Sequence, residues 1–462
     1  MRTVVLGAGP AGCAAVLALA RRGHDVTLID RDEPPALGGA ASAEQIFATW
    51  DRPGIGQFRQ PHNFLGKGRA VLRDEFPDVY AALLAAGAGE IRQDAFLGAA
   101  PREPGDADLA TIACRRPIVD ATLRTAVAKQ PGVTFHTGSV SGVMMRPPHV
   151  TGVRLTSGDE LAADLVVDAT GRNSAANRWT EEHGTPAWTE HTTDSKLLYY
   201  SRHYRFRDEP LPHASILGGP RGDVGYLAFA VFIGDNATFS LCVMAPAWEK
   251  DWRHLRDPEA FERVARELPG MAAWLDAAEP ITHVLPMGQL HNTLRETVVD
   301  DAPLVTGLIP IGDARCHTNP TFAFGLSLSL GHAVALAETA DTATDDKALA
   351  TTFHERVGSD AAARFAAVSA EDRDRVRLWS GERIDPTDRQ QTMPLYLRSV
   401  VYRAAPQDPR LLRAVCRRIN LLDPIDALPS DAELLDRAEA LFKQLPSAVP
   451  TRRDRLLAAL RG

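Results

Sequence analysis

Residues 3–31 read TVVLGAGPAGCAAVLALARRGHDVTLIDR, a short apolar run, a glycine turn, a helical pattern and a second apolar run. This order predicts a strand, a tight turn, a helix and a second strand. The turn carries Gly7, Gly9 and Gly12 in G-x-G-x-x-G spacing, and the second strand ends at Asp30, 18 positions after Gly12. Such glycines allow a tight turn, close approach of the backbone to a pyrophosphate and close helix packing, while the acidic residue can bind a ribose hydroxyl. We therefore predict a dinucleotide site, because an ordinary glycine-rich turn would not explain Asp30.

The composition is that of a globular protein rather than a disordered one. The chain has 462 residues, 45% hydrophobic and 24% charged, which is enough for two or three domains with a large core. The formal net charge is −8 with both signs mixed along the chain, so we expect no nucleic-acid surface.

The cysteines and the apolar runs bear on location. No apolar run approaches the roughly 18 residues that a membrane span requires, and Met1-Arg2 leads directly into the first strand. We therefore expect a cytoplasmic protein with no membrane span. The cysteines lack C-x-x-C spacing and predict neither a disulfide framework nor a zinc site: Cys13, Cys114, Cys242, Cys316 and Cys416.

The rest of the chain divides into blocks of different pattern. A loop at residues 52–69 concentrates Gly, Pro, Gln, Arg and His, and we interpret it as the wall of a site rather than surface filler. A buried strand at residues 164–168 leads into a small-residue turn, A-T-G-R-N-S. Long β-type runs between about 180 and 290 predict a separate antiparallel sheet domain. Past residue 345 the pattern is helical, and we expect a helical cap packed on the nucleotide domain.

Three segments, residues 7–30, 168–174 and 312–325, together resemble the FAD-dependent monooxygenases of the aromatic-hydroxylase type, and most closely their squalene-epoxidase-like and halogenase-like branch. The resemblance rests on the order of the segments and spans about 340 residues. It implies an α/β fold: a Rossmann-like FAD-binding domain of the glutathione-reductase type, an inserted antiparallel β-sheet substrate domain and a helical C-terminal region. We place the FAD domain at 1–180 and 290–345, with the loop 50–110 near the active site, the sheet domain at 181–289 and the helical region at 346–462.

The resemblance also implies which residues hold the cofactor. The middle segment would lie near the pyrophosphate, the Gly312-Asp313 pair would contact the ribitol, and the helix starting near Gly325 would point at the isoalloxazine. Arg116 occupies a position where the family has an arginine near the cofactor, although a surface arginine at a helix start is the alternative. The full set of expected FAD contacts is Gly7, Gly9, Pro10, Ala11, Gly12, Asp30, Arg31, Arg116, Val140, Asp168, Gly171, Gly312, Asp313, Pro320, Gly325 and Leu326.

Residues of the polar loop are the candidates for catalysis. Comparable loops in the family lie close to the flavin, so we assign Arg59, Gln60 and His62 to contacts with the flavin edge or the substrate. Lys67 suggests a halogenase, which uses a lysine for the hypohalous species, but the W-x-W-x-I-P signature of tryptophan halogenases is absent. The group Asp313, Cys316 and His317 lacks a second cluster and predicts pocket or packing rather than a metal site.

The resemblance implies an FAD-dependent oxidoreductase, a monooxygenase that hydroxylates or epoxidises a small, biosynthetic substrate through a flavin C4a-hydroperoxide. Single-component hydroxylases usually have Asp-Gly where this chain has Thr170-Gly171. Because this difference weighs against direct binding of NADPH, two routes for the electrons of NAD(P)H stay open: direct reduction of the flavin, or transfer through a partner flavin reductase. Three alternatives stay open: a reductase or dehydrogenase of the geranylgeranyl-reductase type, a flavin-dependent halogenase, and a non-catalytic flavin-binding protein. The substrate and the oligomeric state do not follow from the sequence.

Overall fold

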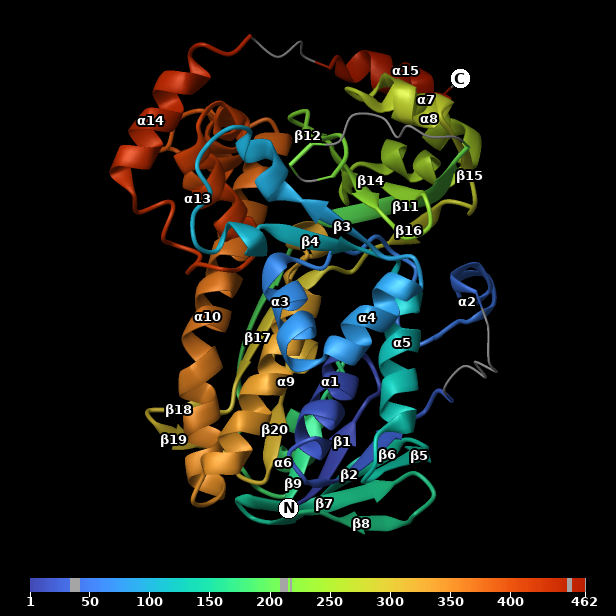
Figure 1. Ribbon diagram of the computed structural model, residues 1–462, viewed down its shortest axis with the longest axis vertical. Coiled ribbons are helices and arrows are strands. Elements are labelled where there is room, and N and C mark those ends of the chain that lie inside the picture. The colour runs from blue at the N-terminus through green and yellow to red at the C-terminus, as the bar shows by residue number, and fades with distance from the viewer. Residues whose placement is uncertain (34–41, 208–214, 217, 447–450, 462) are drawn as a thin grey trace.

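The computed structural model describes residues 1–33, 42–207, 215–216, 218–446 and 451–461. The part of the chain that is predicted to bind a nucleotide contains the N-terminus and forms one end of the elongated molecule (Figure 1). At the other end, an antiparallel sheet domain and a group of C-terminal helices lie side by side (Figure 1). The long helix α10, Asp346–Trp379, runs from the first end towards the second.

The centre of the nucleotide-binding part is a parallel sheet of five strands in the order β20-β9-β1-β2-β5. Successive residues of β1 face opposite layers: Val5 packs with the helices, whereas Val4 and Leu6 pack with a small antiparallel sheet. Because both faces are covered, these strands are apolar throughout. Their bounds are β1 Arg2–Leu6, β2 Asp25–Asp30, β5 Val133–Thr137, β9 Leu165–Asp168 and β20 Leu308–Pro310.

Helices cover one face of this sheet and a three-stranded antiparallel sheet covers the other. The helix after the glycine turn is almost wholly buried, which its alanine-rich and leucine-rich sequence permits. The helices are α1 Pro10–Ala20, α3 Gly66–Glu75, α4 Pro77–Ala85, α5 Arg116–Lys129 and α9 Phe324–Thr342. On the other face lie β6 Val140–Arg146, β7 His149–Leu155, β8 Glu160–Ala162 and the short helix α6 Ala176–Glu181.

The second domain is an antiparallel sheet in the order β12-β13-β14-β11-β15, with β16 also paired to β11. One face packs on two helices through Tyr200, Tyr204 and Leu241, and the other carries Tyr199, Cys242 and similar side chains. The bounds are β11 Leu197–Phe206, β12 Arg221–Asp223, β13 Ala228–Ile233, β14 Thr238–Pro246, β15 Ala278–Pro280, β16 Leu285–Met287, α7 Pro258–Glu267 and α8 Met271–Asp276.

Short connecting elements tie the two parts together. One three-stranded sheet joins β10 Thr189–Asp194, β17 His291–Glu296 and β21 Cys316–His317. Near the loop 50–110 lie α2 Ala43–Thr49 and the hairpin of β3 Gly89–Arg92 and β4 Ala110–Ala113. A second hairpin comprises β18 Val298–Val299 and β19 Ala302–Pro303.

The C-terminal helices do not form one cap on the nucleotide domain as expected. Only α10 joins its core, through Phe353 and neighbouring residues, whereas Leu456 and Leu460 of α15 pack on the sheet domain. The helices between them form their own apolar cluster with Leu97 and Leu109. Their bounds are α11 Met393–Tyr396, a π-helical turn Leu397–Val401, α12 Tyr402–Ala404, α13 Pro409–Ile419, α14 Ala432–Phe442 and α15 Arg453–Arg461.

The predicted fold class is confirmed: a parallel α/β core, antiparallel sheets and a helical C-terminal region. In the part of the chain that the structure describes, no helix combines the length and the apolar character needed to cross a membrane.

Candidate functional site

A large cavity runs from residues at the carboxyl ends of the parallel strands to residues of the sheet domain and the C-terminal helices. Its volume of about 1390 Å³ exceeds the roughly 300–1,000 Å³ of common ligand pockets, so it has room for more than one molecule. Most of the predicted site residues line it: Gly7, Gly9, Pro10, Ala11, Asp30, Arg31, Gln60, His62, Arg116, Val140, Gly171, Asp313, Pro320, Gly325 and Leu326.

The glycine turn leaves space where a dinucleotide phosphate would need it. A Cβ on Gly12 would lie 1.8 Å from the carbonyl oxygen of Gly7, so the chain itself requires a glycine there. Gly7 has φ +94°, which also favours glycine. A Cβ on Gly9, by contrast, would meet nothing within 4 Å, although Gly9 lines the cavity. The open space at Gly9, at the N-terminus of α1, therefore fits a pyrophosphate.

The carboxylate at the end of β2 is surrounded by donors. Asp30 Oδ2 accepts hydrogen bonds from the backbone of Ala8 at 2.5 Å and from Arg52 Nη2 at 2.9 Å, and Arg124 Nη2 lies 3.2 Å away. Burial by itself would raise the pKa of Asp30, but the two guanidinium groups outweigh it and hold the pKa below its usual range. Asp30 is therefore ionised and held in place before any ligand arrives.

Arg52 is the centre of this cluster, and the sequence interpretation missed it. Its side chain is only 3% exposed and contacts three carboxylates: Asp30, Asp32 at 3.1 Å and Asp120 at 3.2 Å. No motif indicates an arginine in the loop as the partner of an aspartate 22 positions earlier. We call Asp30, Asp32, Arg52, Asp120 and Arg124 the nucleotide-side cluster.

His62 and Arg116, two predicted residues, meet at the wall of the cavity. His62 Nε2 lies 3.2 Å from Arg116 Nη1, and Nδ1 lies 2.8 Å from the carbonyl oxygen of Gln60. Burial, followed by the charge of Arg116, lowers the pKa of His62 to about 4. Arg116 in turn donates to Asp120 at 2.5 Å, which joins it to the nucleotide-side cluster. His62 is therefore neutral at pH 7, with Nδ1–H directed at Gln60 and Nε2 accepting from Arg116.

Arg59 does not share this position. Its Nη2 donates to the carbonyl oxygen of Trp50 at 2.9 Å, and its guanidinium lies 5.9 Å from the centre of the Phe47 ring. It is absent from the described lining of the cavity, and its expected contact with the flavin edge or the substrate stays a prediction. Gln60 does line the cavity, while its Nε2 donates to the carbonyl oxygen of Leu285 at 3.2 Å.

Asp168 holds the turn that follows β9 by accepting hydrogen bonds from it. It is fully buried, and its carboxylate accepts from the backbone and hydroxyl of Thr170, at 3.0 and 2.6 Å, and from the hydroxyl of Ser174. It therefore fixes the turn that presents Gly171 to the cavity, and its expected direct contact with the cofactor stays a prediction. Gly12 and Gly312 likewise lie behind the lining residues. The amide of Gly312 donates to His332 Nδ1 at 3.2 Å, a partner the sequence did not reveal.

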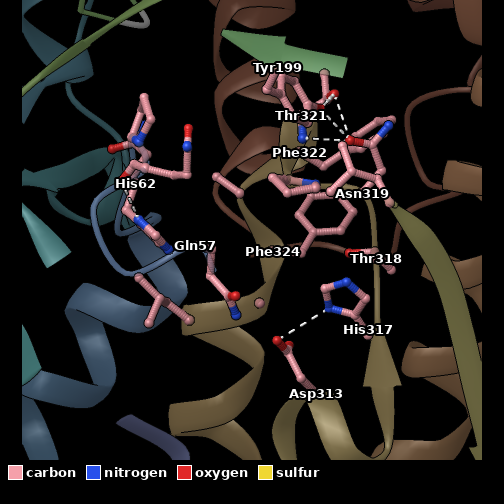
Figure 2. A pocket seen from close by; sticks show the side chains of 18 of the residues that line it. Gln57, His62, Tyr199, Asp313, His317, Thr318, Asn319, Thr321, Phe322 and Phe324 are labelled. Carbon is pink, nitrogen blue, oxygen red and sulfur yellow. Dashed lines mark hydrogen bonds and ion pairs between the residues drawn. The ribbon is translucent and has the colours of Figure 1, made fainter. Parts of the chain in front are cut away.

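The third segment forms the opposite wall. Figure 2 shows Asp313 and His317 facing each other across from Gln57 and His62, with His317 Nδ1 3.2 Å from Asp313 Oδ2. Burial tends to raise the pKa of Asp313, but His317 and Arg116 lower it, so the carboxylate is ionised. Above this pair, α9 begins at Phe324 with its N-terminus at the cavity, where partial positive charge gathers.

A buried polar network fixes the loop before α9. Asn319 accepts hydrogen bonds from the hydroxyl of Tyr199 and from the backbone of Thr321 (Figure 2). It also donates to Asp372 at 2.7 Å. Asn292 donates to the same carboxylate at 2.9 Å and accepts from the backbone of Asn319 at 2.6 Å. The loop is thereby connected to both the sheet domain and α10.

The halogenase alternative receives no support from the position of Lys67. Lys67 lies 3.7 Å from Asp360 and is absent from the described lining, so it is not placed to act on a substrate. Among the residues that the structure describes, no three His, Cys, Asp or Glu side chains gather as metal ligands.

Comparisons with known proteins agree with the fold. Residues 2–199, less than half of the chain, match the family model "Glucose inhibited division protein A". Protein Rv3254 of Mycobacterium tuberculosis is 28% identical over 360 residues, 71% of this chain and 71% of the relative.

Several solved flavoproteins have the same fold. The flavin-dependent brominase Bmp2 matches with a TM-score of 0.60 and 17% identity, covering 96% of this chain and 100% of that chain. PqsL, a probable FAD-dependent monooxygenase from Pseudomonas aeruginosa, matches with a TM-score of 0.59 and 16% identity over 86% and 99% of the two chains. 2-Methyl-3-hydroxypyridine-5-carboxylic acid oxygenase matches with a TM-score of 0.54 and 17% identity over 84% and 95%. The expected similarity of this chain to the flavin-dependent monooxygenases is therefore confirmed at the level of the fold. The same fold is shared with a flavin-dependent brominase.

Proposed function

We propose that this protein is an FAD-dependent monooxygenase that hydroxylates or epoxidises a small organic substrate, with NAD(P)H as the source of electrons. The observation that carries the proposal is the single cavity, in which a glycine turn and an ionised Asp313 continue into an apolar face of the sheet domain. Bound FAD, once reduced, supplies the reaction of O₂ that transfers one oxygen atom to the substrate.

The chain offers groups for the pyrophosphate, the ribose, the ribitol and the flavin ring of FAD. The space at Gly9 and the N-terminus of α1 would hold the pyrophosphate, and Asp30 at the end of β2 would hold the ribose. Asp313 would bind ribitol hydroxyls, because its carboxylate is ionised and lines the cavity. The N-terminus of α9 would favour negative charge on the reduced ring.

The protein's own task is to bind, orient and exclude water. Tyr199, Cys242, Met244 and their neighbours give an apolar wall where a substrate would lie, and a dry wall protects reactive oxygen chemistry from water. His62 stays neutral at pH 7 and holds Arg116 at the cavity wall. Oxygen transfer needs no acid or base from the protein, so the proposed reaction assigns none to the lining residues.

The alternative is a flavin-dependent reductase of the geranylgeranyl-reductase type, which would use the same fold and cofactor groups without consuming O₂. A halogenase is a weaker alternative, because Lys67 does not line the cavity. We further propose a reducing, cytoplasmic location, since the five cysteines are free and buried.

The direct test is an absorbance spectrum of the purified protein, followed by anaerobic NADPH and then air. A flavin band that NADPH bleaches and air restores, with substrate-dependent O₂ uptake, supports a self-sufficient monooxygenase. Bleaching by dithionite alone indicates a partner flavin reductase. Alkene reduction without O₂ uptake would favour the reductase, and a protein that takes up no FAD would refute the proposal.

A pair of glycine variants tests where FAD binds. Gly9→Ala should fold normally, because its Cβ meets no protein atom, but it should weaken FAD binding by roughly tenfold or more, because the Cβ occupies the space for the phosphates. Gly89→Ala in β3 adds a methyl group that also meets nothing within 4 Å but lies outside the cavity lining. Equal FAD affinities for the two variants, measured by quenching of flavin fluorescence, would contradict the site.

A further inference from the structure

The segment that carries Asp313 and His317 is held by the neighbouring strand β17. The backbone amide of Arg295 on β17 donates to the carbonyl oxygen of Arg315 at 2.8 Å. His317 itself pairs with Thr293 in the antiparallel ladder of β21 and β17. The backbone at His317 is therefore fixed, and its side chain extends from a rigid position at the cavity wall.

The imidazole of His317 directs its hydrogen bonding at Asp313. Its Nδ1 lies 3.2 Å from Asp313 Oδ2, and the side chain of His317 is 10% exposed (Figure 2). Its Nε2 is enclosed and has no hydrogen-bond partner among the described residues. Because an ionised carboxylate can only accept, the proton of the neutral imidazole lies on Nδ1. One end of the ring therefore serves Asp313, and the other end makes no hydrogen bond within the described chain.

Asp313 depends on this contact far more than Asp30 depends on any one of its partners. Asp30 accepts hydrogen bonds from two backbone amides and from Arg52. Among the described residues, His317 supplies the one ion pair of Asp313, and no other residue donates to that carboxylate. Burial raises the pKa of Asp313, but the charge and the hydrogen bond of His317, followed by the charge of Arg116, bring it below its usual value.

The other oxygen of Asp313 lies at the beginning of α9. A Cβ on Gly325, the second residue of this helix, would lie 3.3 Å from Asp313 Oδ1. Ala323 at the N-cap offers no side-chain hydrogen bond to the first turn, and that turn contains no acidic residue. Free N–H groups at a helix N-terminus attract a carboxylate as hydrogen-bond donors and through their partial positive charge. Asp313 therefore lies close to a competing set of donors.

From these contacts, and building on the proposed function, we propose that His317 is a positioning residue for FAD: it holds the Asp313 carboxylate for the ribitol hydroxyls and keeps it from capping α9. Without the donor at Nδ1, the carboxylate would turn to the N–H groups of α9. FAD would then lose its ribitol contact, and the positive end of α9 would face a protein carboxylate rather than the flavin ring.

Substitutions that copy one end of the imidazole test this role. The side-chain nitrogen of asparagine takes about the position of Nδ1, whereas that of glutamine takes about the position of Nε2. His317→Asn should therefore keep the donor for Asp313 and bind FAD within about threefold of the unaltered chain. His317→Gln should weaken FAD binding by roughly tenfold, because a hydrogen bond to a charged group is lost. Quenching of flavin fluorescence by the full chain measures both affinities.

A double-mutant cycle separates positioning of Asp313 from general support of the fold. Asp313→Ala removes the carboxylate, so His317→Gln added to it should weaken FAD binding no further. His191→Asn is the matched control, because it removes another contact of a histidine with a carboxylate. His191 Nε2 lies 3.3 Å from Glu296 Oε2, outside the described cavity lining, so this variant should leave FAD affinity unchanged.

Two results would overturn the proposal. One is equal FAD affinity of His317→Gln and His317→Asn, and the other is an equal effect of His317→Gln with and without the Asp313 carboxylate. The unaltered chain separates these results from failure of the proposed function. A chain that binds no FAD refutes both ideas, whereas FAD bound equally by the two His317 variants refutes only the role of His317.

Discussion

Two arginine-rich regions of this molecule handle charge in opposite ways. In the nucleotide-side cluster Arg52 is 3% exposed and contacts three carboxylates. At the cavity wall beside the C-terminal helices, Arg398 is 36% exposed and shares a single carboxylate with Arg375. Arg52 therefore divides its charge among three carboxylates, whereas Arg398 has one carboxylate that it shares with Arg375.

The largest effect should come from breaking the matched cluster. Arg52→Leu would leave Asp30, Asp32 and Asp120 without their shared cation, and we expect a loss of about 3–5 kcal/mol in the free energy of unfolding, as measured by urea denaturation. Arg154→Leu is the control: it removes an exposed pair with Glu160 and should cost at most about 1 kcal/mol. Equal losses would mean that the nucleotide-side cluster is not structural.

Acid should destabilise the folded chain through its buried histidines, whereas arginine keeps its charge over the relevant range. Burial lowers the pKa of three histidines, to about 4 for His62 and His203 and about 3 for His332. The unfolded chain takes up protons near pH 6.5, whereas the folded chain does so only near pH 4 or below. Stability should therefore be full above pH 6.5 and fall as the pH drops towards 4, by up to about 1.4 kcal/mol per pH unit for each histidine.

The measurement is the free energy of unfolding at several pH values between 7 and 4. His203→Leu should make the decline shallower, because it removes one group that protonates on unfolding. A variant whose pH dependence matches that of the unaltered chain would show that His203 is not held neutral by burial.

The smallest effect on stability should come from Arg398 and Arg418, which line the cavity beside the C-terminal helices. Arg398→Gln removes one of several crowded positive charges, and Arg418→Gln removes one without an ion pair among the described residues, so we expect a change within about 0.5 kcal/mol, or a small gain. Thermal unfolding of the ligand-free protein measures this. A loss comparable to that of Arg52→Leu would place these arginines in the structural class and erase the contrast between the regions.

Local sequence patterns predicted the glycine turn and the residues that line the cavity near it. Gly7, Gly9 and Asp30 belong to one strand-turn-helix-strand unit, where spacing along the chain determines position in space. The resemblance also identified Arg116 and His62, and the structure brings these into contact. The sequence did not reveal the protein partners of Arg59 and Asp168, because a residue's position in a loop or turn does not fix the direction of its side chain.

What the sequence by itself determined is the set of elements and the type of cofactor fold, because these depend on periodicity and on glycines at short, fixed separations. What only the tertiary structure decided is the partnership of charges over long separations, such as Arg52 with Asp120, or Arg115 with Asp235. Packing of whole domains brings these groups together, and no local pattern encodes the result. The distinction between a matched and an unmatched arginine therefore belongs to the fold.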